Sequence, residues 1–283
     1  MAIEAIIREL EMEEARTRGL GRISSLFQGR EKQVVGNSAF ILFLFIWEIL
    51  AQNDFLINPV FTSYPSQVFL KLYHMLFVSK ELYIHLLASA KVFVIGFLLA
   101  EFVGIATGML MGRKKLLDYV GSPFVDLFYS CPRIAFLPLF VIWMGIGDAP
   151  KITLVFLSAV FPVIYNTYQG VRDADPSLIE AARSYGATER DILLKVVLLA
   201  AAPFIVAASR LAVGKAIAGV LVAEYFASSV GIGWIIQNSG STFQISRLFA
   251  AVLVISLMGM IGDDGLRFVE KRVAPWRHAR QVE

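Results

Sequence analysis

Long apolar runs separated by short polar segments are the main pattern along this chain. Six runs are long enough to cross a hydrocarbon core of ~30 Å, which takes about 20 helical residues. They cover residues 34–56, 86–111, 119–146, 152–169, 200–225 and 248–269. A shorter amphipathic helix is predicted between the first two runs from the spacing of Val68, Leu72, Met75 and Leu76. The pattern therefore predicts an all-α polytopic membrane protein with about six transmembrane helices.

Three polar regions flank or interrupt the predicted transmembrane domain, residues 34–270. Residues 1–33 combine charged side chains with apolar positions at helical spacing, which predicts an amphipathic segment in the cytoplasm or at the membrane interface. Residues 271–283 form a basic tail. Residues 171–199, between the fourth and fifth predicted spans, carry many charges and cannot lie in hydrocarbon. This is the only large charged loop between predicted spans.

Composition and charge narrow the class of protein further. Apolar residues make up 57% of the chain and charged residues 17%, whereas about 25% of an ordinary soluble domain is charged, so a soluble enzyme is excluded. The net charge of +3 does not indicate a nucleic-acid partner. If the N-terminus is inside, 18 Lys and Arg residues near span ends lie on the inner side and 4 on the outer side. The positive-inside rule then predicts that both termini are cytoplasmic.

The charged loop contains start and stop signals for two short helices. Asp175 is a suitable N-cap, Pro176 suits the first helical turn, and Gly186 provides a C-terminal stop. A second helix is predicted after Thr188, an N-cap residue with Asp191 at the third helical position. Two short helices at an angle would form a compact projection that inserts into a groove on another protein. The alternative is an ordinary solvated hairpin between two spans.

Several ordered motifs resemble one family of membrane proteins. Glu180-Ala181-Ala182, followed by Gly186 and then by residues 196–198 (Val-Val-Leu), resembles the EAA motif of inner-membrane permease subunits of binding-protein-dependent ABC importers. Other matching stretches are Leu137-Pro138-Leu139, residues 143–147 (Trp-Met-Gly-Ile-Gly), residues 173–176 (Asp-Ala-Asp-Pro), Val222-Ala223-Glu224 and Gly231-Ile232-Gly233. These resemble the nitrate, sulfonate and taurine branch, over about residues 60–276. Leu199 stands where the family pattern has a proline, and Pro203 is expected to supply the break before the fifth span.

The resemblance implies the fold and the partners of the protein. It implies the type I ABC importer permease fold, a second copy of the permease in a homodimer, two cytoplasmic ATPase subunits, an extracytoplasmic substrate-binding protein and a place in the bacterial inner membrane. Glu180, Ala181, Ala182 and Gly186 would then contact the ATPase subunits. No Lys in this sequence is followed by Ser or Thr, so the chain has no phosphate-binding Walker A loop. We therefore expect no cofactor in this chain, with ATP and Mg²⁺ bound by the partner ATPase subunits.

Polar residues inside the predicted spans are candidates for a translocation path. Ionisable groups at span centres usually face a bundle interior or a water-filled path. The candidates are Arg133, Asn166, Lys215 and Glu224. Arg133 and Lys215 would favour an anionic substrate, and Glu224 would lie nearer the outer mouth. The alternative is that these side chains form interhelical ion pairs or cap broken helices.

Other function classes have less support. His74, His85 and His278 are too scattered for a metal site, and no Ser lies in a Gly-x-Ser-x-Gly turn, so a membrane-embedded enzyme is not indicated. A secondary transporter driven by an ion gradient is the main alternative; it predicts inverted repeats and midplane carboxylates. Sulfonates, taurine, nitrate, bicarbonate and aromatic or pyrimidine compounds all fit the resemblance as substrates, and the basic residues favour an anion.

Overall fold

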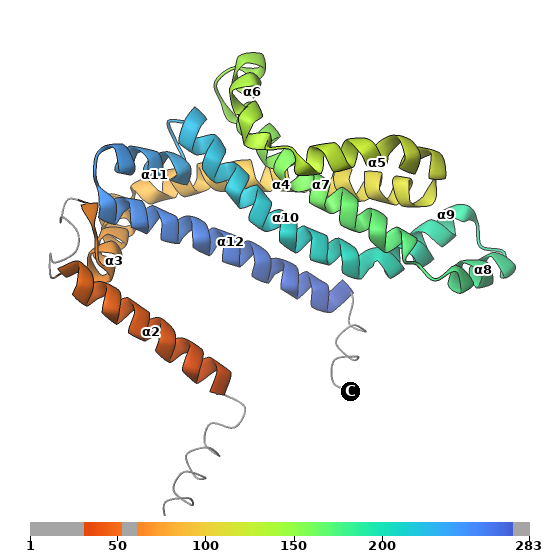
Figure 1. Ribbon diagram of the computed structural model, residues 1–283, viewed down its shortest axis with the longest axis horizontal. Helices are drawn as coiled ribbons and strands as arrows, with labels where there is room; N and C mark the ends of the chain where they lie inside the picture. The colour runs from red at the N-terminus through yellow and green to blue at the C-terminus, as the bar shows by residue number, and fades with distance from the viewer. Residues whose placement is uncertain (1–30, 53–60, 274–283) are drawn as a thin grey trace, which may run out of the picture. The chain divides into compact units, whose positions relative to one another are not determined.

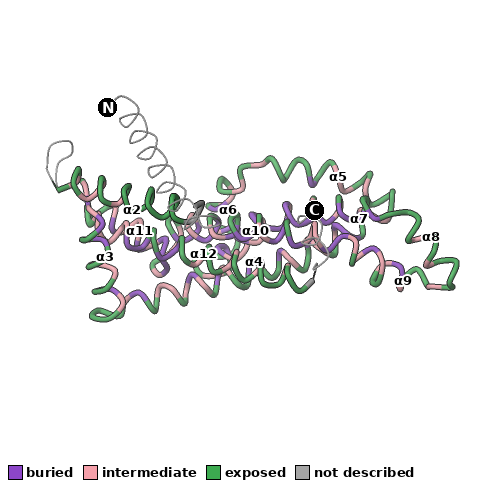
Figure 2. The backbone as a smooth tube through the Cα atoms, turned by 90° about the horizontal axis from the view of Figure 1, so that it is seen from below, coloured by how far each residue is buried: buried purple, intermediate pink, exposed green. Residues whose placement is uncertain are grey.

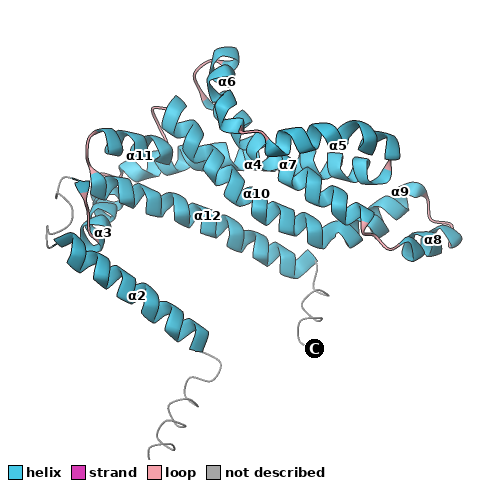
Figure 3. Ribbon diagram, viewed as in Figure 1, coloured by secondary structure: helices cyan, strands magenta, loops and turns pink. Residues whose placement is uncertain are grey.

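The computed structural model describes residues 31–52 and 61–273, and the regular structure in these ranges is helical (Figure 3). The chain divides into two compact units, residues 1–66 and 67–283, which are described separately below. The first half of the described chain contains α2 (Glu31–Gln52), α3 (Pro65–Tyr73), the π-helical turn η2 (His74–Val78), α4 (Glu81–Arg113), α5 (Lys115–Ser130), the 3₁₀ turn η3 (Arg133–Phe136) and α6 (Leu137–Met144). The second half contains α7 (Asp148–Arg172), α8 (Pro176–Ser184), α9 (Glu189–Asp191), the π-helical turn η4 (Ile192–Val197), α10 (Leu198–Ala227), α11 (Ile232–Ser241) and α12 (Ile245–Val273). The predicted segment 1–33 lies largely outside the described residues.

Five of the described helical stretches are long and apolar enough to cross a membrane. They are Val34–Gln52, Glu81–Arg113, Asp148–Arg172, Glu189–Ala227 and Ile245–Arg272. A sixth is obtained if the bent pair Lys115–Ser130 and Arg133–Met144 counts as one span. An all-α polytopic membrane protein with about six spans, as the sequence predicts, is therefore confirmed.

The third predicted span, residues 119–146, is divided rather than continuous. Helix α5 ends at Ser130, and the following helical stretch turns by 89° relative to it. Pro132 explains the break, because proline lacks a backbone N–H and disfavours the helical conformation of the residue before it. Cys131 accordingly adopts an extended conformation, with φ −72° and ψ 136°.

The predicted break at Pro203 is not present. Helix α10 continues through Pro203, and the helical stretch that contains it runs from Glu189 to Ala227. A proline inside a helix removes one backbone hydrogen bond, and long membrane-spanning helices tolerate this loss where neighbouring groups compensate. The expectation that Pro203 replaces the missing family proline as a helix break is therefore wrong.

Within the first unit, the end of α2 is joined to the segment that follows it. The Glu48 carboxylate accepts hydrogen bonds from Ser66 N (3.0 Å) and Ser66 Oγ (2.7 Å). Ser66 lies in the first turn of α3, where backbone N–H groups have no partner within the helix. Trp47 Nε1 also donates to the carbonyl of Ser63 at 3.0 Å. A carboxylate on α2 thus supplies a partner for the Ser66 N–H.

The second unit is built around α4, α7 and α10, which pack closely along their lengths. Glycines on α4 allow this approach: a Cβ added at Gly104 would lie 2.7 Å from Val163 Cβ, and one at Gly108 would lie 2.7 Å from the carbonyl of Ile164. Together with Gly112, these glycines form two overlapping Gly-xxx-Gly patterns on α4, which serve packing inside one chain. Figure 2 shows buried residues gathered along α7 and α10, whereas α5 and α8 are mostly exposed.

The two ends of the second unit differ in their short helices. Helices α8 and α9 lie at one end of the α4, α7 and α10 bundle, and α11 lies at the opposite end (Figure 1). At the α11 end, a buried apolar cluster joins α11 to α12, with Ile232, Ile235 and Val254 among its members. The charged loop and the Gly231-Ile232-Gly233 motif are therefore separated by the length of the bundle.

Candidate coupling and translocation sites

The charged loop folds into two short helices that begin where the sequence predicts. Asp175 Oδ1 accepts a hydrogen bond from Ser177 N at 2.8 Å, and Pro176 is the first residue of α8. Hydrogen bonds from the Ser177 side chain and backbone hold the pKa of the Asp175 carboxyl below its ordinary value. At the second start, Thr188 Oγ1 accepts from Asp191 N at 3.2 Å. Both predicted N-caps are confirmed.

Gly186 ends α8 in a left-handed conformation. Its φ is +82°, a region that favours glycine, and its N–H donates to the carbonyl of Arg183 at 3.0 Å. Ala187 N donates to the carbonyl of Ala182, also at 3.0 Å. These two bonds form a Schellman motif, in which the backbone turns sharply and the last helical carbonyls keep partners. The predicted role of Gly186 as a helix stop is confirmed.

We call residues 175–191 the knob. The knob contacts the ends of the long helices of the bundle. Ile192, directly after it, is fully buried in an apolar cluster with Met109 of α4 and Val171 of α7. Glu189 forms ion pairs with Arg113 at the end of α4 and with Arg183 of α8, the latter at 2.9 Å. Apolar packing and ion pairs therefore join the knob to the ends of two long helices.

The outer face of the knob exposes small and large side chains together. Glu180 and Ala181 are exposed, while Ala182 is half-buried against the bundle. Leu178 is 55% exposed and Tyr185 is 93% exposed. Exposed apolar groups beside small residues are typical of a docking surface. Sequence reasoning missed Leu178 and Tyr185, although a tyrosine directly before the turn glycine of a charged loop was an available signal.

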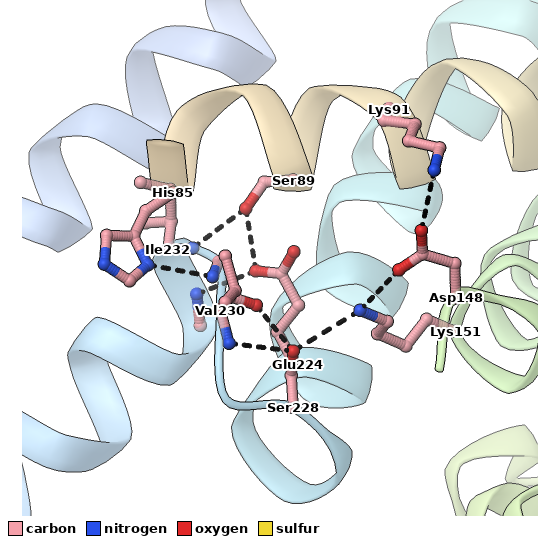
Figure 4. Close-up of polar contacts among 11 residues, drawn as sticks. His85, Ser89, Lys91, Asp148, Lys151, Glu224, Ser228, Val230 and Ile232 are labelled. Carbon is pink, nitrogen blue, oxygen red and sulfur yellow. Dashed lines mark hydrogen bonds and ion pairs between the residues drawn. The ribbon is translucent and has the colours of Figure 1, made fainter. Parts of the chain in front are cut away.

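A buried polar cluster at the α11 end brings together two motifs that are separate in the sequence. Glu224 is 0% exposed; its Oε2 accepts from Ser89 Oγ of α4 at 2.8 Å and from Gly233 N of α11 at 2.9 Å (Figure 4). Ser89 Oγ in turn accepts from Ile232 N at 2.8 Å. A Cβ added at Gly231 would lie 2.2 Å from Glu224 Cδ. The Gly-Ile-Gly turn is therefore shaped around the Glu224 carboxyl group.

Neighbouring side chains extend this cluster on both sides. His85 Nδ1 accepts from Gly231 N at 3.0 Å, and the His85 ring stacks on Trp234 with centroids 5.2 Å apart. On the other side, the nearly buried Lys151 ammonium lies 2.8 Å from Asp148 Oδ1. Figure 4 also shows Lys91 Nζ 2.9 Å from Asp148 Oδ2 and Lys151 Nζ 3.3 Å from Ser228 Oγ. Ser228 Oγ in turn accepts a hydrogen bond from Val230 N at 3.2 Å. The cluster therefore ties α4, α7, α10 and α11 together at one end of the bundle.

The structure gives different surroundings to the four residues predicted to line a path. Arg133 lies at the break after α5, where its guanidinium donates to the carbonyls of Phe128 (3.1 Å), Ser158 (3.3 Å) and Tyr129. Asn166 Nδ2 donates to the carbonyl of Pro162 on its own helix at 2.8 Å. Both side chains satisfy backbone groups, so for Arg133 the capping alternative is the geometry found.

Glu224 and Lys215 differ most in exposure, since Glu224 is buried and Lys215 is exposed. Glu224 is enclosed by its own chain, so its side chain does not line an open path in this conformation. Its expected place near the outer mouth stays a prediction. Lys215 is exposed on α10, and its side chain has no ion pair or hydrogen bond within residues 31–52 and 61–273. Within that part of the chain, neither Glu224 nor Glu101 of α4 forms an ion pair with Arg133 or Lys215. Glu101 instead accepts a hydrogen bond from Ser209 Oγ at 2.8 Å.

Metal ligands are dispersed in the described part of the chain. Among those residues, no group of three or more His, Cys, Asp or Glu side chains lies close enough to hold a metal ion.

Comparison with known proteins places the chain in a family. Residues 100–275 match the family described as "Binding-protein-dependent transport system inner membrane component". The chain belongs to this family and is the membrane-spanning permease subunit of an ABC importer, a multi-pass protein of the inner membrane whose role is transport rather than catalysis. The resemblance drawn from the sequence motifs is confirmed.

Individual relatives and solved structures agree with this assignment. The taurine transport system permease protein TauC of Escherichia coli is 32% identical over 237 residues, which cover 82% of this chain and 86% of TauC. The aliphatic sulfonates transport permease protein SsuC of Bacillus subtilis is 34% identical over 204 residues, 72% of this chain and 74% of SsuC. An inward facing structure of the MetNI methionine ABC transporter matches with a TM-score of 0.53 at 23% identity, covering 69% of this chain and 97% of that one. This structural likeness shows the predicted type I importer permease fold.

Proposed function

We propose that this chain forms the membrane passage of an ATP-driven importer for small sulfonates, and that the knob is its contact with the ATPase subunits. The observation that carries the coupling role is the knob itself: a compact projection with exposed Leu178 and Tyr185 beside Glu180 and Ala181. Two ATPase subunits would bind ATP and Mg²⁺ and hydrolyse the ATP, while this chain supplies no catalytic group and holds no cofactor.

Coupling follows from the way the knob is fixed to the bundle. A groove on the ATPase that moves during the ATP cycle would carry the knob with it as a rigid body. Glu189 passes that movement to α4 through Arg113, and Ile192 passes it to α10 through the continuous helix. The spans would then switch between outward and inward openings. Such a switch requires that ATP and its hydrolysis products favour different conformations.

The assembly would contain further partners. A second copy of the permease would complete the passage as a homodimer, and an extracytoplasmic binding protein would deliver the solute. The distribution of Lys and Arg, 18 on one side against 4 on the other, supports a cytoplasmic position for both termini and for the knob. Membrane lipid surrounds the outer faces of the spans, where exposed apolar residues of α5 and α12 are numerous.

The substrate class rests on the names of two relatives and on charge. TauC is named for taurine and SsuC for aliphatic sulfonates. Lys215 is an exposed cation in the middle of a spanning helix, and such a charge requires water, a counter-ion or a protein partner. We assign Lys215 to the passage as a contact for the sulfonate group, while Arg133 caps the break after α5 and Asn166 bonds within its own helix.

Reconstitution of the complete transporter tests this function. The permease, its ATPase subunits and its binding protein are placed in proteoliposomes, and uptake of a radiolabelled alkanesulfonate is measured. ATP-dependent uptake that stops without the ATPase subunits supports the proposal. Uptake by the permease alone under a proton or sodium gradient would contradict it and support a secondary transporter.

A further inference from the structure

The N-terminus of α11 receives its hydrogen-bond acceptors from two other helices. The first N–H groups of a helix have no partner within it, and Gly231, the residue before α11, supplies no side-chain cap. Gly231 N donates to His85 Nδ1 of α4 at 3.0 Å, and Ile232 N donates to Ser89 Oγ, one turn further along α4, at 2.8 Å. The N–H group after these donates to Glu224 of α10 at 2.9 Å. Three consecutive N–H groups thus fix the start of α11 to α4 and α10.

His85 Nδ1 is the acceptor among these three that a proton removes. A neutral imidazole accepts through one ring nitrogen, so the bond from Gly231 requires that the ring proton lies on Nε2. An imidazolium carries a proton on both nitrogens and has no acceptor. The Ser89 hydroxyl does not titrate between pH ~5 and ~8, and a protonated carboxyl group at Glu224 would still offer an oxygen acceptor. The contact between His85 and Gly231 therefore exists only while His85 is neutral.

The His85 ring is held in one orientation and is open to solvent. It is parallel to the Trp234 ring within 6°, with centroids 5.2 Å apart, and Nδ1 points at the turn before α11 (Figure 4). The side chain is half-buried, and within residues 31–52 and 61–273 its Nε2 has no hydrogen bond. The second proton binds Nδ1 only after the ring and the turn separate. Acid therefore favours the separated conformation.

Charged groups near His85 offer the imidazolium another partner. Glu81 lies four residues earlier on α4, a spacing at which side chains are neighbours. Arg247 of α12 pairs with Glu81 at 3.0 Å. Helix α11 carries no ionisable side chain, and α10 contributes Glu224 on the other side of the turn. A protonated His85 would compete with Arg247 for Glu81, so protonation weakens the contacts of α4 with both α11 and α12.

This contact lies at the end of the bundle opposite to the knob (Figure 1). If the knob faces the ATPase subunits, His85 faces the compartment from which the solute is taken. The helical stretch Glu189–Ala227 joins the knob to the turn before α11. A change at His85 therefore acts on the same helix that would transmit the movement of the ATPase subunits.

We propose that the hydrogen bond from Gly231 N to His85 Nδ1 is a pH-sensitive latch, closed while His85 is neutral and opened by acid on the side from which the solute is imported. An open latch lowers transport because the end of α10 is no longer fixed to α4. The side of the membrane that the latch faces and its effect on uptake rest on the proposed function, whereas the chemistry of the contact does not.

Two substitutions of His85 separate the acceptor from the charge. In His85→Asn, the side-chain oxygen lies as many bonds from Cα as Nδ1 does, and it accepts a hydrogen bond at every pH. In His85→Phe, the ring can still stack on Trp234 but offers no acceptor at any pH. His74→Asn is the matched control, because His74 of η2 is an exposed histidine whose side chain has no hydrogen bond within the described ranges.

The first measurement is the thermal midpoint of the purified permease–ATPase complex between pH ~8 and ~5, the range in which histidine titrates. The closed latch contributes stability at the upper end of this range and loses it as the pH falls. Wild type and His74→Asn should therefore fall below His85→Asn in acid by roughly 2–4 °C, the shift expected from one hydrogen bond. The difference between wild type and His85→Phe should shrink over the same range. Parallel profiles of wild type and His85→Asn would overturn the proposal.

The second measurement is ATP-dependent uptake of an alkanesulfonate into proteoliposomes that hold the complete transporter. The pH is changed outside while the lumen, which holds ATP and faces the knob, stays at constant pH. Acid outside should lower uptake by wild type and by His74→Asn about fivefold relative to His85→Asn. This factor corresponds to about 1 kcal/mol, the contribution of one hydrogen bond. The binding protein is the same in every sample, so its own response to pH cancels in the comparison.

The remaining outcomes separate the latch from the function on which it rests. Equal uptake by wild type and His85→Asn in acid would overturn the control of transport by the latch, and a response to the pH of the lumen alone would overturn its sidedness. If wild type imports no sulfonate with ATP at any pH, the proposed sulfonate import fails. The midpoint profiles would then still support or refute the contact between His85 and Gly231.

Discussion

Replacing Gly231 with alanine should break the hydrogen bonds of the buried polar cluster around Glu224, at the α11 end of the bundle. Gly231 has φ +126°, and an added Cβ would lie 2.2 Å from Glu224 Cδ and 2.4 Å from both carboxyl oxygens. The carboxyl group would have to leave its place and give up the hydrogen bonds from Ser89 and Gly233. The α10–α11 turn would then lose the group around which it is built.

The size of the effect follows from the groups left unpaired. Ser89 Oγ keeps the N–H of Ile232 as a partner, so the main losses are the Glu224 carboxyl and the Gly233 N–H. A buried polar group without a partner costs about 1–3 kcal/mol, so the two together cost about 2–6 kcal/mol. A non-glycine residue in this backbone region adds about 1–3 kcal/mol.

Gly145 provides a matched control for the backbone cost. It has φ +78° and ψ 179°, close to the conformation of Gly231 (φ +126°, ψ 167°), but an added Cβ would meet nothing within 4 Å. Gly145→Ala therefore isolates the conformational strain. The thermal midpoint of the purified complex should fall further in Gly231→Ala than in Gly145→Ala, by roughly 5–20 °C at about 2–4 °C per kcal/mol.

A double-mutant cycle completes the test. In a Glu224→Ala background, Gly231→Ala should cost no more than Gly145→Ala, because the clashing carboxyl group is gone. If Gly231→Ala and Gly145→Ala lower the midpoint equally in the wild-type background, or if the effects of Gly231→Ala and Glu224→Ala add, the proposed contact between the carboxyl group and the turn is refuted.

Three further predictions concern docking, the path and topology. Tyr185→Ala should leave the midpoint of the permease unchanged, since the side chain is 93% exposed, but weaken ATPase binding about tenfold, measured by co-purification; unaltered binding would exclude Tyr185 from the contact. Arg133→Gln should lower the midpoint by removing hydrogen bonds to carbonyls, each worth about 0.5–1.5 kcal/mol. Lys215→Gln should reduce uptake with a normal midpoint, and the reverse pattern would contradict both assignments. On a cysteine-free background, a cysteine at Lys80 should react with an impermeant reagent from outside and one at Lys114 should not; labelling at Lys114 would reverse the topology.

Features that depend on residues close together in the sequence were predictable from it. The caps of the knob rest on Asp175, Gly186 and Thr188, each of which acts on backbone groups within a few positions of itself. The six apolar runs likewise reflect a local requirement for length and hydropathy. The break at Pro132 also has a local cause, although the sequence did not show that the helix direction changes by 89° there.

The polar cluster around Glu224 could not be predicted in the same way. The sequence singled out the Val-Ala-Glu and Gly-Ile-Gly stretches, but their contact depends on how α10 turns into α11. The Ser89 hydroxyl that completes the site lies 135 positions away in the sequence. The sequence alone does not distinguish a charged residue that lines a path from one that is buried in a core or caps a helix. Glu224 was therefore predicted to line a path, and the structure shows that it is enclosed.

The most direct test of the account is the coupling ratio, the number of solute molecules imported per ATP hydrolysed, in Gly186→Val. Gly186 has φ +82° and open space around it, so a β-branched residue strains the Schellman turn without a clash. Gly145→Val, at another open glycine with positive φ, is the control. The account predicts that Gly186→Val hydrolyses ATP with a sharply reduced coupling ratio, while Gly145→Val keeps the wild-type ratio. A wild-type ratio in Gly186→Val would contradict the role of the knob as the coupling element.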